Sequence, residues 1–66
     1  MSRPSWNVRR LIIEALIGED LSTRDLAHEV GESVFVVNRH LDALRSKGDV
    51  IRFGRAWRLI NTDDAA

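Results

Sequence analysis

The segment 33–48 limits the possible folds most, because it carries the signals for both ends of a helix. Ser33 can cap the first turn, and Gly48 can end the last turn in the left-handed conformation that glycine adopts without strain. Between them, apolar side chains recur at the spacing of one helical face, at Val34, Val37, Leu41 and Leu44. The segment therefore predicts a helix over 33–47 that packs along one face.

The opposite face of this helix is polar and contains one aromatic ring. At about 100° per residue, it presents Phe35, Arg39, Asp42 and Ser46, with Asn38 and Arg45 on one side and His40 and Lys47 on the other. Planar hydrogen-bond donors on a helix can read base edges in a groove of DNA. We expect His40 to be partly buried at the flank, with a phosphate contact as the alternative.

The length predicts a single small domain. A chain of 66 residues is near the lower limit for an unassisted core, since it buries only about 60% of its unfolded surface. It has no Cys, which favours an intracellular protein; if the source is prokaryotic or a phage, we expect it in the cytoplasm or associated with the nucleoid. The apolar runs are too short for a membrane span, and the N-terminus lacks the hydrophobic region of a signal peptide.

The net charge of zero is an average over blocks of opposite sign. Residues 1–10 carry three Arg and no acidic residue, whereas 11–32 carry one Arg and six acidic residues. Residues 33–60 carry six basic and two acidic residues. A basic C-terminal half beside an acidic middle predicts one side that faces a polyanion and another that faces solvent or a partner.

A first helix is predicted over 6–17, between Ser5 as the cap and Gly18 as the terminator. Its broad inner face holds Val8, Leu11, Ile12, Ala15 and Leu16. A second apolar stripe beside it holds Trp6, Ile13 and Ile17. A helix this apolar is expected at the centre of the core, with a dimer contact of the second stripe as the alternative. Residues 1–5 are expected to form a flexible arm.

The next segment predicts a short edge strand at Leu21 and a second helix. Ser22 or Thr23 can cap this helix, and Ser22 with an acidic residue three positions later has the form of a capping box. Its packing residues are Leu26, Ala27 and Val30, and Gly31 ends it. The short turn that remains before the helix over 33–47 has the spacing of a helix-turn-helix.

After Gly48 the apolar period changes to 2, which predicts a hairpin of strands 50–53 and 57–60. A two-residue loop of Gly54 and Arg55 would mix apolar and basic faces. A three-residue loop separates them, because it pairs Phe53 with Trp57. We therefore predict the three-residue loop, with four side chains buried and three basic ones along the edge and tip. The buried set is Ile51, Phe53, Trp57 and Leu59; the basic set is Arg52, Arg55 and Arg58. Residues 61–66 are predicted to be a disordered acidic tail.

This order of elements resembles a winged helix-turn-helix domain. The resemblance rests on LSTRDLA at 21–27, Gly31, Ser33, VNRHL at 37–41, Leu44, 47–48, 50–51 and 57–59. It implies a small α+β fold of three helices with a C-terminal two-stranded hairpin, the wing, over residues 6–60. It also implies a sequence-specific transcription regulator, such as a repressor, whose third helix enters the major groove of double-stranded DNA. The wing would then contact the DNA backbone or the minor groove.

Within that family, a weaker resemblance points to the subfamily that binds Z-form nucleic acid. It rests on VNR at 37–39, Leu41, Leu44, Gly48 and Trp57. The chain departs from that pattern at Asp42, where the subfamily has Tyr, and at 55–56, where it has a Pro pair. It also has Val34 and Phe35 in place of Lys.

The predicted DNA-contacting residues come from the third helix and the hairpin. Arg39 can donate two hydrogen bonds to guanine, and Asn38 can pair with adenine or donate to phosphate. Arg45, Lys47 and Arg55 are expected at phosphates. The full set is Ser33, Phe35, Asn38, Arg39, Arg45, Lys47, Arg52, Arg55 and Arg58. Trp57 is expected in the core, with its indole N–H reaching a phosphate at the edge as an alternative.

Other classes of function find less support in the residues. There is no Gly-rich phosphate loop and no thiol, and the two His lie on different helices, so no enzyme activity and no cofactor are predicted. His28 and Glu32 are spaced to share a metal, but acidic surface clusters without a metal are commoner, so no metal is predicted. The main alternative is a protein-interaction module that uses Phe35 and Val36. The expected partners are double-stranded DNA and either a second copy or another protein.

Overall fold

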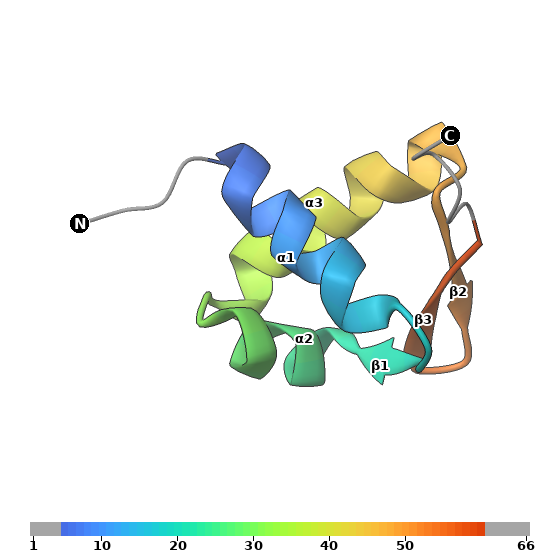
Figure 1. Cartoon of the computed structure of the whole chain (residues 1–66), viewed down its shortest axis with the longest axis horizontal. Helices are drawn as coiled ribbons and strands as arrows, with labels where there is room; N and C mark the ends of the chain where they lie inside the picture. Colours follow the sequence, from blue (N-terminus) through green and yellow to red (C-terminus); the bar gives the residue numbers. More distant parts are fainter. Residues whose placement is uncertain (1–4, 61–66) are drawn as a thin grey trace.

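The computed structural model describes residues 5–60, which form three helices and a three-stranded antiparallel sheet (Figure 1). The elements in chain order are α1 Ser5–Leu16, β1 Leu21–Ser22, α2 Thr23–Val30, α3 Val34–Lys47, β2 Val50–Phe53 and β3 Ala56–Leu59. The small α+β architecture and the order of its elements agree with the sequence-based expectation. The predicted acidic tail lies outside the described residues, as does the predicted arm apart from Ser5, which begins α1.

Local signals fix the ends of α2 and α3 as predicted. The Ser22 hydroxyl accepts a hydrogen bond of 3.0 Å from the Asp25 backbone N–H at the start of α2. The Ser33 hydroxyl accepts one of 3.1 Å from the Val36 N–H at the start of α3. Gly48 ends α3 with a φ of 85°, a region where a side chain would be strained. Each serine satisfies one free N–H at a helix start, and the Gly48 N–H donates to the Arg45 carbonyl at the end of α3, so these ends lie where the sequence indicates.

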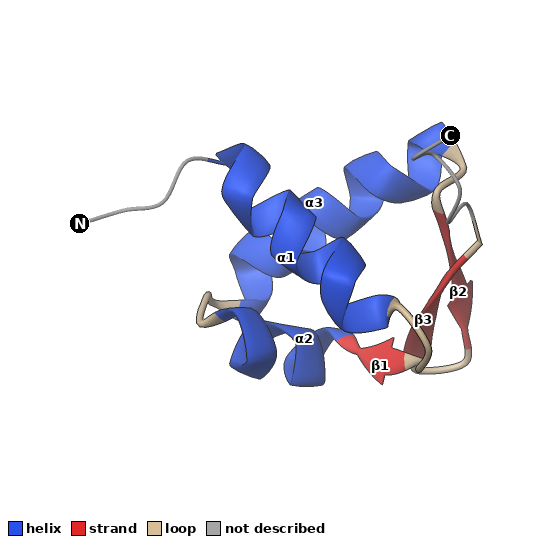
Figure 2. Ribbon diagram, in the orientation of Figure 1, coloured by secondary structure: helices blue, strands red, loops and turns tan. Residues whose placement is uncertain are grey.

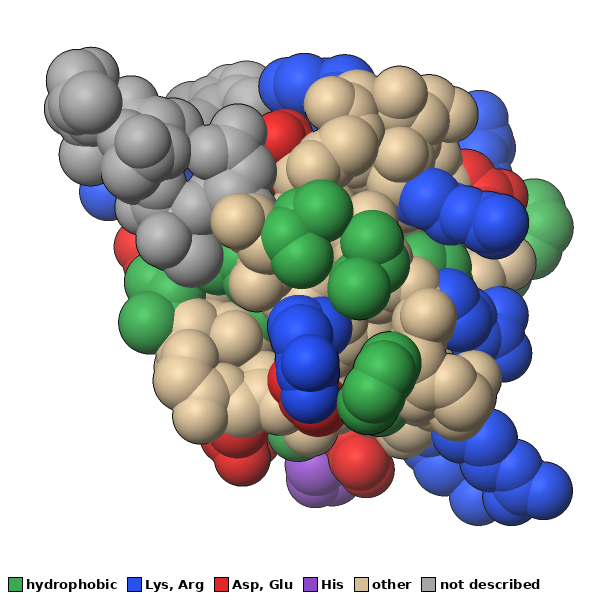
Figure 3. Space-filling model, turned by 90° about the vertical axis from the view of Figure 1, so that its right-hand side faces the viewer, with side chains coloured by type: hydrophobic (Ala, Val, Ile, Leu, Met, Phe, Trp, Pro, Cys, Tyr) green, Lys and Arg blue, Asp and Glu red, His purple; other side chains and the backbone are tan. Residues whose placement is uncertain are grey.

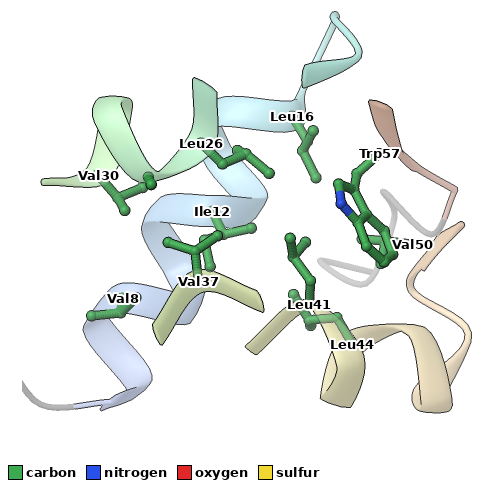
Figure 4. Close-up of a cluster of buried hydrophobic side chains, with 11 residues drawn as sticks. Val8, Ile12, Leu16, Leu26, Val30, Val37, Leu41, Leu44, Val50 and Trp57 are labelled. Atoms are coloured by element: carbon green, nitrogen blue, oxygen red, sulfur yellow. The ribbon is translucent and has the colours of Figure 1, made fainter. Parts of the chain in front are cut away.

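One hydrophobic core joins the three helices to the sheet. Figures 1 and 2 show α1 crossing in front of α3, with α2 below and the sheet at one side. The core consists of Val8, Ile12, Leu16, Leu26, Ala27, Val30, Val37, Leu41, Leu44, Val50 and Trp57 (Figure 4). Trp57 is the largest of the fully buried side chains, so it fills the space between the helices and the sheet.

Two apolar residues predicted to pack are exposed instead. Val34 is 49% exposed, because it stands on the first turn of α3 about 60° around the helix from the buried Val37. Ile17 is 62% exposed, because α1 ends one residue earlier at Leu16. Ile13 packs partly against the core as expected, and the side chain of Trp6 lies outside the described part of the chain.

The sheet has the order β1-β3-β2, so β3 is the hairpin strand that pairs with β1, the strand just before α2. The predicted short strand at Leu21 is confirmed, and Leu21 pairs with Trp57. The Trp57 indole N–H donates a hydrogen bond of 2.9 Å to the Thr23 hydroxyl at the start of α2. Trp57 is therefore a core residue, as predicted, but its N–H is bonded inside the protein and not directed to a phosphate.

The predicted three-residue hairpin loop is wrong. The strands pair Phe53 with Ala56 and Arg52 with Trp57, which leaves a loop of two residues, Gly54 and Arg55. Gly54 has a φ of 66° and no non-glycine residue of the described chain has a positive φ, so the loop has the form of a type II′ turn. This turn matches the twist of the two strands, and its geometry outweighs the separation of apolar and basic faces.

The observed pairing changes which side chains of β2 are buried. Val50 is 1% exposed, whereas Ile51 and Phe53, which were predicted to be buried, are 38% and 54% exposed. The hairpin tolerates apolar and basic side chains on the same face because the two arginines within its strands lie over aromatic rings. The guanidinium carbon of Arg52 is 5.3 Å from the ring centre of Trp57, directly opposite. That of Arg58 is 4.3 Å from the Phe53 ring, on the diagonal.

None of the helices between residues 5 and 60 has both the length and the apolar character needed to cross a bilayer. The longest of them, α3, has 14 residues. A helix that spans a membrane needs roughly 20 residues of apolar character.

Paired alanine substitutions in β2 test the register. Val50→Ala should lower the free energy of unfolding by about 1–3 kcal/mol, because it removes a fully buried side chain. Phe53→Ala should cost less than about 1 kcal/mol, although it removes more atoms, because the ring is exposed and loses mainly its contact with Arg58. Urea denaturation of both variants measures the two values. A larger loss for Phe53→Ala would favour the three-residue loop.

Candidate nucleic-acid interface

The outer face of α3 is the first part of the candidate interface. Val37, Leu41 and Leu44 are fully buried, so the rotation of α3 about its axis is fixed. Asn38 and Arg39 are consequently exposed on the side away from the core. The Ser33 hydroxyl oxygen accepts the capping bond, so this residue positions the helix, and its O–H remains able to donate to a ligand.

Phe35 is exposed, as the helical spacing predicts. Its side chain is 70% accessible, the highest value among the large hydrophobic residues of the described chain. The guanidinium carbon of Arg39, one turn later, lies 5.9 Å from the centre of the Phe35 ring. An exposed ring beside an arginine offers a stacking surface and two planar donors at one place on α3.

Basic side chains at the C-terminal end of α3 differ in how they are held. The Lys47 ammonium is 3.6 Å from the Asp49 carboxylate. The Arg45 side chain is exposed and makes no hydrogen bond or ion pair with the rest of residues 7–60. A surface ion pair such as Lys47–Asp49 contributes at most about 1 kcal/mol, so Lys47 can leave Asp49 to bind a stronger anion.

The hairpin supplies the second part of the candidate interface. The Nε–H of Arg52 donates a hydrogen bond of 3.2 Å to the Gly54 carbonyl, which holds the arginine along the strand. Arg55 is exposed at the tip and has no bonded partner in the described chain. Of the three hairpin arginines, Arg55 is therefore the one whose donors are all available to a ligand.

Arg58, one of the predicted DNA-contacting residues, is paired with an acidic residue of the same chain. Its guanidinium donates two hydrogen bonds to the Asp20 carboxylate, of 3.1 Å and 2.9 Å. These bonds lower the pKa of Asp20 and raise that of Arg58 relative to their ordinary values. The sequence gives no local sign of this pair, because 38 positions separate its members.

The surface is divided by charge. Figure 3 looks at the sheet side of the molecule, so α1 is towards the left and α3 towards the right. Several Lys and Arg side chains lie along the right-hand margin of this view, and acidic side chains lie with a His at the lower margin, the level of α2 in Figure 1; further acidic side chains lie beside basic ones at the right and upper edges. Hydrophobic side chains are also exposed near the middle of this view. The exposed large apolar residues of β2 are Ile51 and Phe53.

A concave pocket between α1 and α3 brings in a residue that the sequence did not single out. The pocket has a volume of about 450 Å³, and Arg9, Val36, Arg39, His40 and Ala43 line it. His40 is partly buried, as predicted. Its pKa is lowered by burial and by the nearby Arg9 and Arg39, while Glu32 opposes this shift. Arg9 comes directly after Val8, which is buried in the core. This position next to the buried face of α1 is the only feature of the sequence that could have indicated Arg9.

Metal binding finds no support within residues 7–60, where no group of three or more His, Cys, Asp or Glu side chains is close enough to hold an ion. His28 and Glu29 are both exposed on α2, so they face solvent. The acidic residues of α2 are thus a solvated face of the part of the molecule that the structure describes.

The Asp20–Arg58 pair predicts an acid titration that can be measured. In the native protein, carboxyl carbon NMR should place the pKa of Asp20 below its ordinary value. Arg58→Gln should raise this pKa, whereas Arg55→Gln should not, since Arg55 is at the other end of the strand. Because the folded-state pKa is lowered, the contribution of the pair to stability is present above the unfolded pKa of about 3.9 and is lost as the pH falls through the folded value. Equal pKa values in all three proteins would exclude the pair in solution.

The chain was also compared with protein-family models, curated proteins and solved structures. None of these comparisons gives a match. The geometry of the described residues therefore carries the functional argument.

Proposed function

We propose that the chain is a winged helix-turn-helix domain that binds double-stranded DNA, with α3 in the major groove and the β2–β3 hairpin as the wing. The observation that carries this proposal is the outer face of α3. It exposes Asn38 and Arg39 beside each other, on a helix whose rotation is fixed by the core. These two side-chain types make the bidentate contacts that distinguish adenine and guanine in the major groove.

The arrangement of elements supports the same function. α2 and α3 are joined by a turn that begins with Gly31, and the hairpin follows α3 directly after Gly48. β1 pairs with β3, so the hairpin is attached to the start of α2 as well as to the end of α3. A helix presented in this way can enter a groove while the hairpin reaches the adjoining backbone.

The available donors divide into two roles. Arg39 and Asn38 would read base edges, with Phe35 against a thymine methyl group or an opened base step. Arg45 and Lys47 on α3, and Arg52 and Arg55 on the hairpin, would contact phosphates and give affinity without sequence information. Arg58 is the weakest candidate, because a phosphate must compete with its two bonds to Asp20.

The acidic face of α2 determines which side turns away from DNA. Asp25 and Glu29 are exposed there, together with Arg24, the one Lys or Arg of the helix. Carboxylates oppose a phosphate backbone, so this face is expected to stay in solvent. Binding of Z-form nucleic acid finds less support, because Trp57 is 1% exposed and its N–H is bonded to Thr23.

An NMR titration with a mixed-sequence duplex tests the proposal. Amide shifts should concentrate on 33–47 and 52–58 and spare 19–32. Arg55→Ala should weaken binding to all duplexes, because it removes a phosphate contact, whereas Arg24→Ala is the matched control on the acidic helix. With about four to six phosphates contacted, log K should fall with log salt by about 0.9 per contact. Shifts confined to 19–32 would contradict this docking.

Arg39→Ala should separate base reading from phosphate binding. It should lose about 1–3 kcal/mol of preference for the best duplex over a mismatched one, if the contact with guanine is bidentate. Competition binding with the two duplexes measures this difference. Arg45→Ala, which removes the same charge from the same helix, should weaken binding to both duplexes alike. An unchanged preference in Arg39→Ala would show that this residue does not read bases.

A protein-interaction module is the second candidate, and exposed apolar side chains of α3 favour it. Phe35 is 70% exposed and the adjacent Val34 is 49% exposed, while Val36 is partly buried against the core. Adjacent exposed apolar residues on a small domain commonly mark a binding surface. A second copy of the chain, bound to a half-site about one turn of the DNA helix away, would combine DNA binding with a protein contact.

Phe35→Ser distinguishes the two candidates. The thermal midpoint should change little, because the ring is exposed; a loss of several degrees would mean that the ring is part of the core. If Phe35 contacts DNA, the variant should bind its preferred duplex more weakly. Unchanged duplex binding together with loss of self-association, measured by sedimentation equilibrium, would favour a protein interface.

A further inference from the structure

The pocket between α1 and α3 collects positive charge from two elements. Arg9 comes from α1, and Arg39 and His40 come from α3 on successive positions. The remaining lining residues described for it, Val36 and Ala43, are apolar. No carboxylate is among them, so the interior of the pocket has a positive potential that nothing in its described lining neutralises.

Arg9 is held in the pocket with a donor unused. Its Nε atom is buried and makes no hydrogen bond with the part of the chain that the structure describes. A buried donor without an acceptor is costly, and nearly all such groups in folded proteins find a partner. Because this atom is closed to solvent, an oxygen atom from outside can accept its N–H only after the Arg9 side chain rotates toward the pocket.

The charges around His40 point to the sign of that external group. Arg9 on α1 and Arg39 on α3 both disfavour the protonated imidazole, and Glu32 in the turn before α3 favours it weakly. Burial is the largest cause of the lowered pKa. An anion in the pocket would offset the repulsion that the protonated imidazole meets from Arg9 and Arg39, and its oxygens would accept N–H donors from all three side chains.

We propose that Arg9, Arg39 and His40 form a binding pocket for a phosphate group. The guanidinium groups match the geometry of phosphate oxygens, which accept two parallel N–H bonds from an arginine fork. The phosphate can belong to the DNA backbone or to a small phosphorylated ligand. In the first case the inference rests on the proposed function, and Arg39 then lies at the border between the base-reading face and the pocket. Arg39→Ala should in that case weaken binding to both duplexes in addition to reducing the preference between them.

Inorganic phosphate is the first probe, added to the full chain at constant ionic strength with chloride as the reference anion. Amide shifts should concentrate near residue 9 of α1 and residues 36–43 of α3. The pKa of His40 should rise when phosphate is present, because the bound anion stabilises the imidazolium; His28, exposed on α2, serves as the internal reference. Shifts spread over the whole surface, or equal shifts with chloride, would overturn the pocket.

Matched variants on α1 test the role of Arg9. Arg9→Gln should weaken phosphate binding roughly fivefold to tenfold, the scale of one charge-assisted contact. Arg10→Gln removes the same charge from the neighbouring position, where Arg10 is exposed and pairs with Glu14, and should have little effect. Arg9→Lys keeps the charge without the fork and should bind with intermediate affinity. Circular dichroism confirms that each variant is folded. Equal losses of phosphate affinity in Arg9→Gln and Arg10→Gln would show that only the net charge of the protein matters, and would reject the pocket.

A duplex titration of the same variants separates the two sources of phosphate. If a backbone phosphate occupies the pocket, Arg9→Gln should weaken duplex binding and lower the salt slope by about one contact, and inorganic phosphate should compete. Phosphate binding in the pocket with no duplex binding would support the pocket for a small phosphorylated ligand and reject the proposed function. Duplex binding on α3 without any phosphate response or Arg9 effect would reject the pocket and leave the proposed function intact.

Discussion

The rotation of α3 about its own axis is the constraint on which the rest of the structure depends. Val37, Leu41 and Leu44 are all removed from solvent, and they face α1, α2 and the sheet at once. A turn of the helix by one residue, about 100°, would place polar groups such as Asn38 in the core at a large desolvation cost. Apolar packing on one side thus decides which donors are available on the other.

Trp57 connects the sheet to this helical core. The residue pairs with Leu21 in β1, fills the space beside Val50, and gives its N–H to Thr23. In a domain of this size, one large buried side chain is a substantial part of the core. Its burial also fixes where the hairpin stands relative to α3, and so where Arg55 can reach.

The arginines differ in function because they differ in their local partners. Arg52 and Arg58 cover aromatic rings of the hairpin, and Arg58 is also paired with Asp20, so both contribute to the structure of the sheet. Arg39 and Arg55 have no ion-pair partner within the described chain and are available to a ligand. The positive surface is therefore smaller and more localised than the count of basic residues implies.

The sequence alone determined the three helices, the caps of α2 and α3 and the exposed position of Phe35, because these depend on residues within one or two turns of each other. Tertiary structure decided the hairpin register, since turn geometry outweighed the face pattern that predicted burial of Phe53. It also decided the Arg58 ion pair with Asp20 and the position of Arg9 beside His40. These contacts join residues far apart in the chain, and only the packing of α1, α3 and the sheet brings them together.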